Sequence, residues 1–136
     1  MKLAWLKTYA NIKITLPIVA GVLMLLSLLN PLLSQFYDRF FTGSYLVDPL
    51  VGALVGTISF GIPVVSYVTG GEMLKEGVSL VAVTAFILSW SLVNFVMLPL
   101  EISNLGRRLA IWRNVLNFFI SIIMAILTVI TLKIII

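Results

Sequence analysis

The sequence predicts an all-α integral membrane protein with three to four transmembrane helices, and three observations support this fold class. First, 61% of the 136 residues are hydrophobic and 10% are charged, whereas soluble domains are about half apolar and a quarter charged. Second, the apolar residues form runs of about 20, the length that crosses a bilayer as a helix. Third, the Lys and Arg residues are scattered singly between these runs, as in membrane proteins that keep their cations at helix ends.

The composition also excludes several classes of function. The chain has no cysteine and no histidine, which removes disulfide frameworks, thiolate nucleophiles, zinc sites and imidazole bases. We therefore expect no enzyme activity, no metal and no cofactor. The net charge of +4 forms no basic stripe, so we expect no nucleic-acid partner.

Residues 14–33 form the first predicted transmembrane helix. This run is longer than the apolar core of a signal peptide, which has about 7–15 residues. Pro17 lies near its start and Pro31 near its end, where proline kinks or stops a helix. Residues 34–44 mix charges with aromatic side chains and predict a connection at the membrane surface.

The second segment, residues 46–68, is unusual because glycines and prolines interrupt it. A break at Gly61-Ile62-Pro63 is compatible with either a full crossing or a re-entrant hairpin that enters and leaves on one face. Four crossings would place five Lys and Arg residues on one side and four on the other. Such a balance gives almost no orientation signal and is typical of a dual-topology protein.

A hairpin gives an ordinary positive-inside distribution, and we therefore favour three full crossings. Six cations then lie on one side and three on the other, namely Lys2, Lys7, Lys13, Arg107, Arg108 and Arg113 against Arg39, Lys75 and Lys133.

Two further transmembrane helices complete a single membrane domain over residues 1–136. Residues 78–100 predict an uninterrupted helix that ends at Pro99, and residues 109–132 predict the last helix. Asp48, at the start of the second segment, is expected in headgroup water. Transporters commonly place their sites between two structural repeats, and this chain has the size of one repeat. We therefore expect a homodimer or a partner of similar size.

The break supplies the first candidate site, formed by Gly61, Pro63, Ser66 and Tyr67. A broken helix exposes backbone groups that can bind an ion or a polar solute, and the N-terminus of a half-helix favours anions. The alternative is a packing kink, in which glycine only permits close approach of helices.

The last helix supplies a second candidate site. Its polar face has spacings of three and four residues and contains Asn114, Asn117, Ser121, Met124, Thr128 and Thr131. These side chains either bond packed helices together or line a solute path. Asn94 near the end of the third segment has the same two interpretations, with interhelical bonding favoured. Arg113 is expected to pair with Glu101 or Glu72, or to meet an anionic substrate.

Residues 56–119 resemble a family of predicted prokaryotic permeases that includes organoarsenical exporters. The resemblance lies in a series of short motifs: Gly61-Ile62-Pro63, Ser66-Tyr67, Gly70-Gly71-Glu72-Met73-Leu74, Gly77-Val78-Ser79-Leu80, Val81-Ala82-Val83-Thr84-Ala85-Phe86, Leu98-Pro99-Leu100-Glu101, Leu105-Gly106-Arg107-Arg108 and Arg113-Asn114. Full-length members look like two related halves in one chain, and this sequence resembles one free-standing half. The resemblance implies a multi-pass protein of a prokaryotic plasma membrane that pairs with itself or with a sibling half.

The sequence also departs from that family in two ways. Organoarsenical exporters use cysteines, and this chain has none, so arsenic binding by thiolate is unsupported. Ile62 stands before Pro63, where many relatives have a polar residue. We expect a permease subunit that moves a small solute or ion as a dimer of halves. The alternative is a non-transporting membrane scaffold that assembles other subunits.

Overall fold

The computed structural model describes the backbone at residues 2–59, 61–93 and 95–136, and the side chains there except at residues 2–5, 26, 29, 30, 33, 34 and 38. The described residues form helices and turns without any strand. The elements are α1 (Lys2–Phe40), α2 (Val47–Ile58), α3 (Pro63–Lys75), α4 (Leu80–Leu92), the 3₁₀ turn η1 (Phe95–Met97), α5 (Leu98–Leu105) and α6 (Arg107–Ile135).

Three segments of the described chain are long and apolar enough to cross a membrane: Leu6–Leu25, Leu80–Leu105 and Arg107–Ile135. The predicted all-α fold with apolar helices of membrane-spanning length is therefore confirmed.

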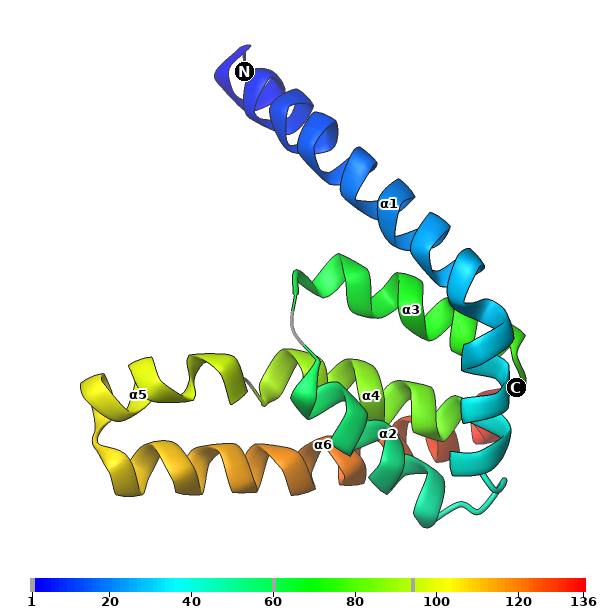
Figure 1. The fold of residues 1–136 in the computed structure, drawn as a ribbon. Coiled ribbons are helices and arrows are strands. Elements are labelled where there is room, and N and C mark those ends of the chain that lie inside the picture. The colour runs from blue at the N-terminus through cyan, green and yellow to red at the C-terminus, as the bar shows by residue number, and fades with distance from the viewer. Residues whose placement is uncertain (1, 60, 94) are drawn as a thin grey trace.

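The first helix is longer than the sequence predicts. α1 continues through both Pro17 and Pro31 and ends only at Phe40, so most of the expected surface connection is helical. Each proline removes one backbone hydrogen bond, but in an apolar environment the helix remains the only local way to satisfy the other backbone groups. Only the last turns of α1 approach the other helices, and Figure 1 shows its N-terminal part extending away from them.

α2 and α3 pack on α4 in opposite directions. Along α2, Gly52 lies against Ala82 and Gly56 against Ser89, so α2 runs parallel to α4. On the α3 side the order is reversed: Gly61, before α3, lies against Trp90, and Gly70, later in α3, lies against the earlier residues Val83 and Ile87. α3 is therefore antiparallel to α4. The two short helices therefore form a helical hairpin around α4, which can be followed in Figure 1.

Small residues allow these helices to approach closely. A Cβ atom at Gly56 would lie 2.1 Å from Ser89 Oγ and 2.4 Å from the carbonyl oxygen of Phe86. Next to this contact, Ala53 of α2, Ala85 of α4 and Ala125 of α6 are fully buried against one another. Glycine and alanine at helix contacts are typical of membrane bundles, where close van der Waals packing replaces the hydrophobic driving force.

The third predicted segment is not the uninterrupted helix that the sequence indicates. α4 ends at Leu92, a 3₁₀ turn follows, and Pro99 lies in the first turn of α5 instead of ending a helix. Proline is tolerated there because the first backbone N–H groups of a helix have no intrahelical partner. α5 and α6 then form an antiparallel pair joined at Gly106.

Two halves of the molecule can now be distinguished. The near half holds α2, α3, α4 and the C-terminal part of α6. The far half holds α5 and the N-terminal part of α6 (Figure 1). Among the described residues, α2, α3 and α4 of the near half each contain buried side chains, whereas α5 of the far half contains none.

Candidate functional site

The break between α2 and α3 is held in place by α4. Gly61 has a φ of +152°, a conformation that residues with a Cβ rarely adopt. Its carbonyl oxygen accepts a hydrogen bond from Trp90 Nε1 at 3.2 Å. A Cβ at Gly61 would also lie 3.2 Å from the Trp90 ring. The tip of the hairpin is thus fixed by one glycine and one indole.

The other residues predicted at the break point in different directions. Pro63 begins α3, where its fixed φ suits the first helical turn. Ser66 is fully buried and donates from Oγ to the Pro63 carbonyl oxygen at 2.7 Å. Tyr67 has 62% of its surface exposed, so its side chain points away from the buried Ser66 side chain.

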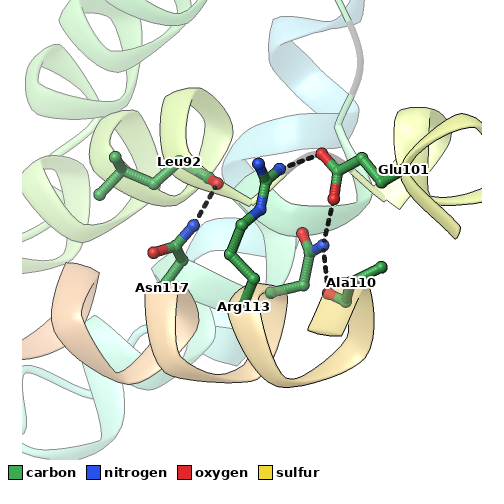
Figure 2. Close-up of polar contacts among 6 residues, drawn as sticks. Leu92, Glu101, Ala110, Arg113 and Asn117 are labelled. Carbon is green, nitrogen blue, oxygen red and sulfur yellow. Dashed lines mark hydrogen bonds and ion pairs between the residues drawn. The ribbon is translucent and has the colours of Figure 1, made fainter. Parts of the chain in front are cut away.

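A second break follows the end of α4 at Leu92. The carbonyl oxygen of Leu92, at the end of α4, accepts a hydrogen bond from Asn117 Nδ2 at 3.1 Å, as Figure 2 shows. The end of a helix leaves its last carbonyl groups without intrahelical partners, and Asn117 satisfies one of them. Trp90 and Leu92 are two residues apart, so both breaks lie at nearly the same level along α4. Asn94, predicted as a site residue, lies outside the described residues.

A polar group in the far half connects α5 to α6, and we call Glu101, Arg113 and Asn114 the clasp. Arg113 forms an ion pair with one carboxylate oxygen of Glu101, and Asn114 Nδ2 donates to the other at 2.8 Å (Figure 2). Of the partners expected for Arg113, the structure places Glu101 beside it. The Glu101 side chain is 14% exposed and that of Arg113 is 45% exposed. Sharing one carboxylate fixes the register of the two helices.

The hydroxyl groups of the predicted polar face bond within their own helix. Ser121 is fully buried and donates to the Phe118 carbonyl oxygen at 2.7 Å. Thr128 and Thr131 make equivalent bonds one turn back. The predicted polar face therefore divides into Asn114 and Asn117, which contact other elements, and hydroxyl groups that contact the backbone of α6.

Asp48 lies where the sequence did not predict it. Expected in headgroup water, it is 1% exposed, in the first turn of α2. Its Oδ1 accepts a hydrogen bond from the backbone N–H of Thr42 at 3.0 Å. Oδ2 is buried without a hydrogen-bond partner among the described residues. The position is favourable for a carboxylate because the N-terminus of a helix carries partial positive charge.

The hairpin also encloses a cavity that the sequence gives no sign of. It has a volume of about 580 Å³ and lies between the end of α1, both arms of the hairpin and α4. Phe86 and Met73, each no more than 2% exposed, line it, and Ser59 and Trp90 line it near the break. Ligand sites commonly have this size and are mostly apolar with a few polar groups.

The groups described at the two breaks are backbone carbonyls, an indole N–H and the carboxamide of Asn117, which are suited to binding and to holding helices in place. No family model matches the chain, and comparisons with curated proteins and with solved structures gave no match either.

Proposed function

We propose that this chain is one half of a membrane permease that moves a small solute or ion, working as a homodimer or with a sibling half. The observation that carries the proposal is the pair of helix breaks that meet beside Trp90 and Leu92. Discontinuous helices at membrane depth are the usual place for substrate and ion sites in transporters. Irregular backbone is tolerated there only where it is buried in protein or lines a cavity.

The hairpin is proposed to be re-entrant. α2 has 12 residues and α3 has 13, so each is about 18–20 Å long and too short to cross a hydrocarbon core of about 30 Å. Its tip contacts Trp90, and Leu80–Leu105 spans 26 residues, so the tip lies near the middle of that span. The hairpin then enters from the near end and turns back at mid-depth.

This topology also accounts for the distribution of charge. The N-terminus and the Gly106 turn share one side of the membrane with six of the nine Lys and Arg residues. Lys75 at the end of α3 and Lys133 near the end of α6 lie on the opposite side. An excess of cations on one side is the rule for cytoplasmic faces, so the N-terminus is cytoplasmic in this proposal.

The resemblance to the predicted prokaryotic permeases supports the same function. The proposed solute site lies between the break at Gly61 and the polar side chains Asn114 and Asn117 of α6. In a single chain, the described far half consists of α5 and the N-terminal part of α6. A second copy of the chain, or a sibling subunit, is therefore needed to enclose a path. A multi-pass position in a prokaryotic plasma membrane follows from the same proposal.

Cysteine accessibility tests the proposal directly, because the chain has no native cysteine. Single substitutions Ser59→Cys and Asn117→Cys place thiols at the two breaks, and Ile123→Cys provides a control on the exposed surface of α6. We expect a membrane-impermeant methanethiosulfonate to modify the two break positions and to leave Ile123→Cys unmodified. If neither break position reacts from either side of the membrane, no water-filled path reaches them and the permease proposal fails.

The same reagent tests the topology. Ser44→Cys and Gly71→Cys lie before α2 and within α3, and a re-entrant hairpin exposes both to the same side. Labelling from opposite sides would make the second segment a full crossing. Labelling of each position from both sides would indicate dual topology.

A scaffold remains the second candidate function, and one observation favours it. The span Leu6–Leu25 has none of its surface buried against the rest of the chain, so a whole helix is available to another subunit. In a scaffold, Asn117 serves only helix contacts. Asn117→Ala would then lower assembly, whereas in a permease it would lower transport while assembly is retained.

A further inference from the structure

The cavity beside the hairpin has a mostly apolar lining, and a cationic side chain lies in a neighbouring hollow. The aromatic rings at the end of α1, among them Phe36 and Phe40, line it at the near end. These two rings are stacked with their centroids 4.5 Å apart. At its other end the cavity reaches Ser59 and Trp90, at the break. The wall that α2 contributes runs from Val51 to Ser59, about 12 Å along the helix.

Arg39 lies next to two of the rings that line the cavity. It lines a second hollow together with Phe36 and Phe40, which also line the first. Arg39 is exposed, and within the described side chains no carboxylate pairs with it. Two carboxylates at the end of α3 lie near Tyr37, two residues from Arg39 along α1: burial raises the pKa of the Tyr37 hydroxyl, and the charges of Glu76 and Glu72 raise it further. Of these two, Glu72 pairs with Lys75. An exposed guanidinium group therefore lies beside the aromatic rings that line the cavity.

We propose that this cavity and Arg39 together bind one phospholipid, with an acyl chain inside the hairpin and the phosphate at Arg39. The chemistry of the two parts matches that of the ligand. An apolar cavity open to the bilayer is filled favourably by a hydrocarbon chain, because it restores the contacts that empty walls lack. Arginine binds phosphate through parallel N–H groups and is the preferred residue for this geometry.

The position of Arg39 also fits. It lies in the last turn of α1, at the end of the molecule where α2 begins and α3 ends. A lipid whose headgroup is at that surface places its chain parallel to α2, toward mid-depth. The inference does not depend on transport, because a scaffold with the same hairpin would bind the same lipid.

Tryptophan fluorescence in lipid vesicles tests the proposal, because bromine on an acyl chain quenches an indole that it touches. The three tryptophans of the chain are Trp5, Trp90 and Trp112. A chain with Trp5→Phe and Trp112→Phe keeps only Trp90, which lines the cavity. A chain with Trp5→Phe and Trp90→Phe keeps only Trp112, whose side chain is 64% exposed on α6 and reports general lipid contact.

The probes are dibrominated phosphatidylcholine, dibrominated phosphatidylglycerol and dibrominated diacylglycerol, which has no phosphate. We expect both phospholipids to bind at Trp90 about five times more tightly than diacylglycerol, the effect of one arginine at a membrane surface. Trp112 should show no such preference. Arg39→Gln should abolish the preference at Trp90, and Arg108→Gln, at the far end, should leave it unchanged.

A second pair of variants tests the acyl chain alone. Val55→Phe adds a ring inside the cavity and should reduce quenching of Trp90 by all three lipids, whereas Ile123→Phe on the exposed face of α6 should not. Equal quenching by phospholipid and diacylglycerol, unchanged by Arg39→Gln, would exclude the phosphate contact. Quenching of Trp90 that is insensitive to Val55→Phe would exclude a chain in the cavity.

Discussion

In the near half, α2, α3 and α6 pack on α4 through glycine, alanine and serine, whereas in the far half α5 is joined to α6 by the charged and amide groups of the clasp. Gly56 lets α2 lie directly on α4, and Ala53, Ala85 and Ala125 are completely buried. In the far half, α5 has no buried residue, and Glu101 shares its carboxylate between Arg113 and Asn114.

The difference reflects how many helices are available to pack. Where several helices meet, small residues bring the backbones together and many weak dispersion contacts accumulate. Where only two helices meet, little surface can be buried, and a few strong polar contacts hold the register. The Glu101 side chain is only 14% exposed, and the attraction between opposite charges is stronger where less water surrounds them. The following predictions separate these two kinds of stabilisation.

The largest effect is expected from Gly56→Ala. The new methyl group would overlap with Ser89 Oγ and with the Phe86 carbonyl oxygen, so α2 must move away from α4. Overpacking of this kind costs about 1–3 kcal/mol, and contact with the backbone places it near the upper end. The free energy of unfolding in mixed detergent micelles, measured by titration with dodecyl sulfate, gives the loss.

Gly71→Ala is the matched control for that experiment. Gly71 also lies in a helix of the hairpin, but a Cβ there would meet nothing within 4 Å. Alanine favours a helix over glycine by about 1 kcal/mol, so this variant should be neutral or slightly more stable. If both variants lose the same stability, close packing of α2 on α4 is not what holds the near half.

The clasp should contribute an intermediate amount. Glu101→Gln and Arg113→Gln each leave one charge without its partner at a partly buried position, which should cost about 1–2 kcal/mol. Because the residues act together, the double variant should lose less than the sum of the two single losses. The same detergent titration measures all three values.

The pair formed by Glu72 and Lys75 is a suitable comparison for the clasp. It has a similar charge pairing, but its side chains are 29% and 72% exposed. Exposed pairs contribute about 0–1 kcal/mol, so Glu72→Gln should have little effect. Additive losses at Glu101 and Arg113 would show that the clasp does not act as a unit.

The smallest effect is expected at the break of α4. Asn117→Ala removes the hydrogen bond to the Leu92 carbonyl oxygen, and interhelical bonds in membrane proteins average about 0.6 kcal/mol. Thr128→Ala removes a hydroxyl that bonds only within α6 and should have a still smaller effect. Equal losses from the two variants would mean that Asn117 does not stabilise the break.

Composition and spacing were sufficient for the fold class and for one of the two breaks. Long apolar runs have few alternatives to helices in lipid, because every backbone group must be bonded internally. Gly61 and Pro63 marked the first break because both residues restrict or release the backbone in a recognisable way. The interruption after Leu92 has no such residue, since Pro99 lies seven residues later, in the first turn of the next helix. Sequence reasoning therefore placed an uninterrupted helix there.

The partners of the polar residues needed the tertiary structure. Spacing predicted that Asn114, Asn117 and Ser121 share one face of α6, but it did not distinguish the two amides that reach other elements from the hydroxyl that bonds its own helix. Burial of Asp48 was missed because a carboxylate near a segment end is usually solvated. Here the first turn of α2 lies inside the packed near half.

The sequence by itself determined that this chain forms apolar helices, since hydropathy depends on composition over about 20 residues and not on neighbours in space. It also determined where the chain turns at Gly61, since backbone conformation there is a local property. Only the tertiary structure decided that α2 and α3 fold back around α4, that a cavity opens between them, and that Glu101 holds α5 to α6. These features depend on contacts between residues that are distant in the sequence, such as Gly61 with Trp90 and Gly56 with Ser89. No local pattern specifies which small or polar side chain will meet which partner.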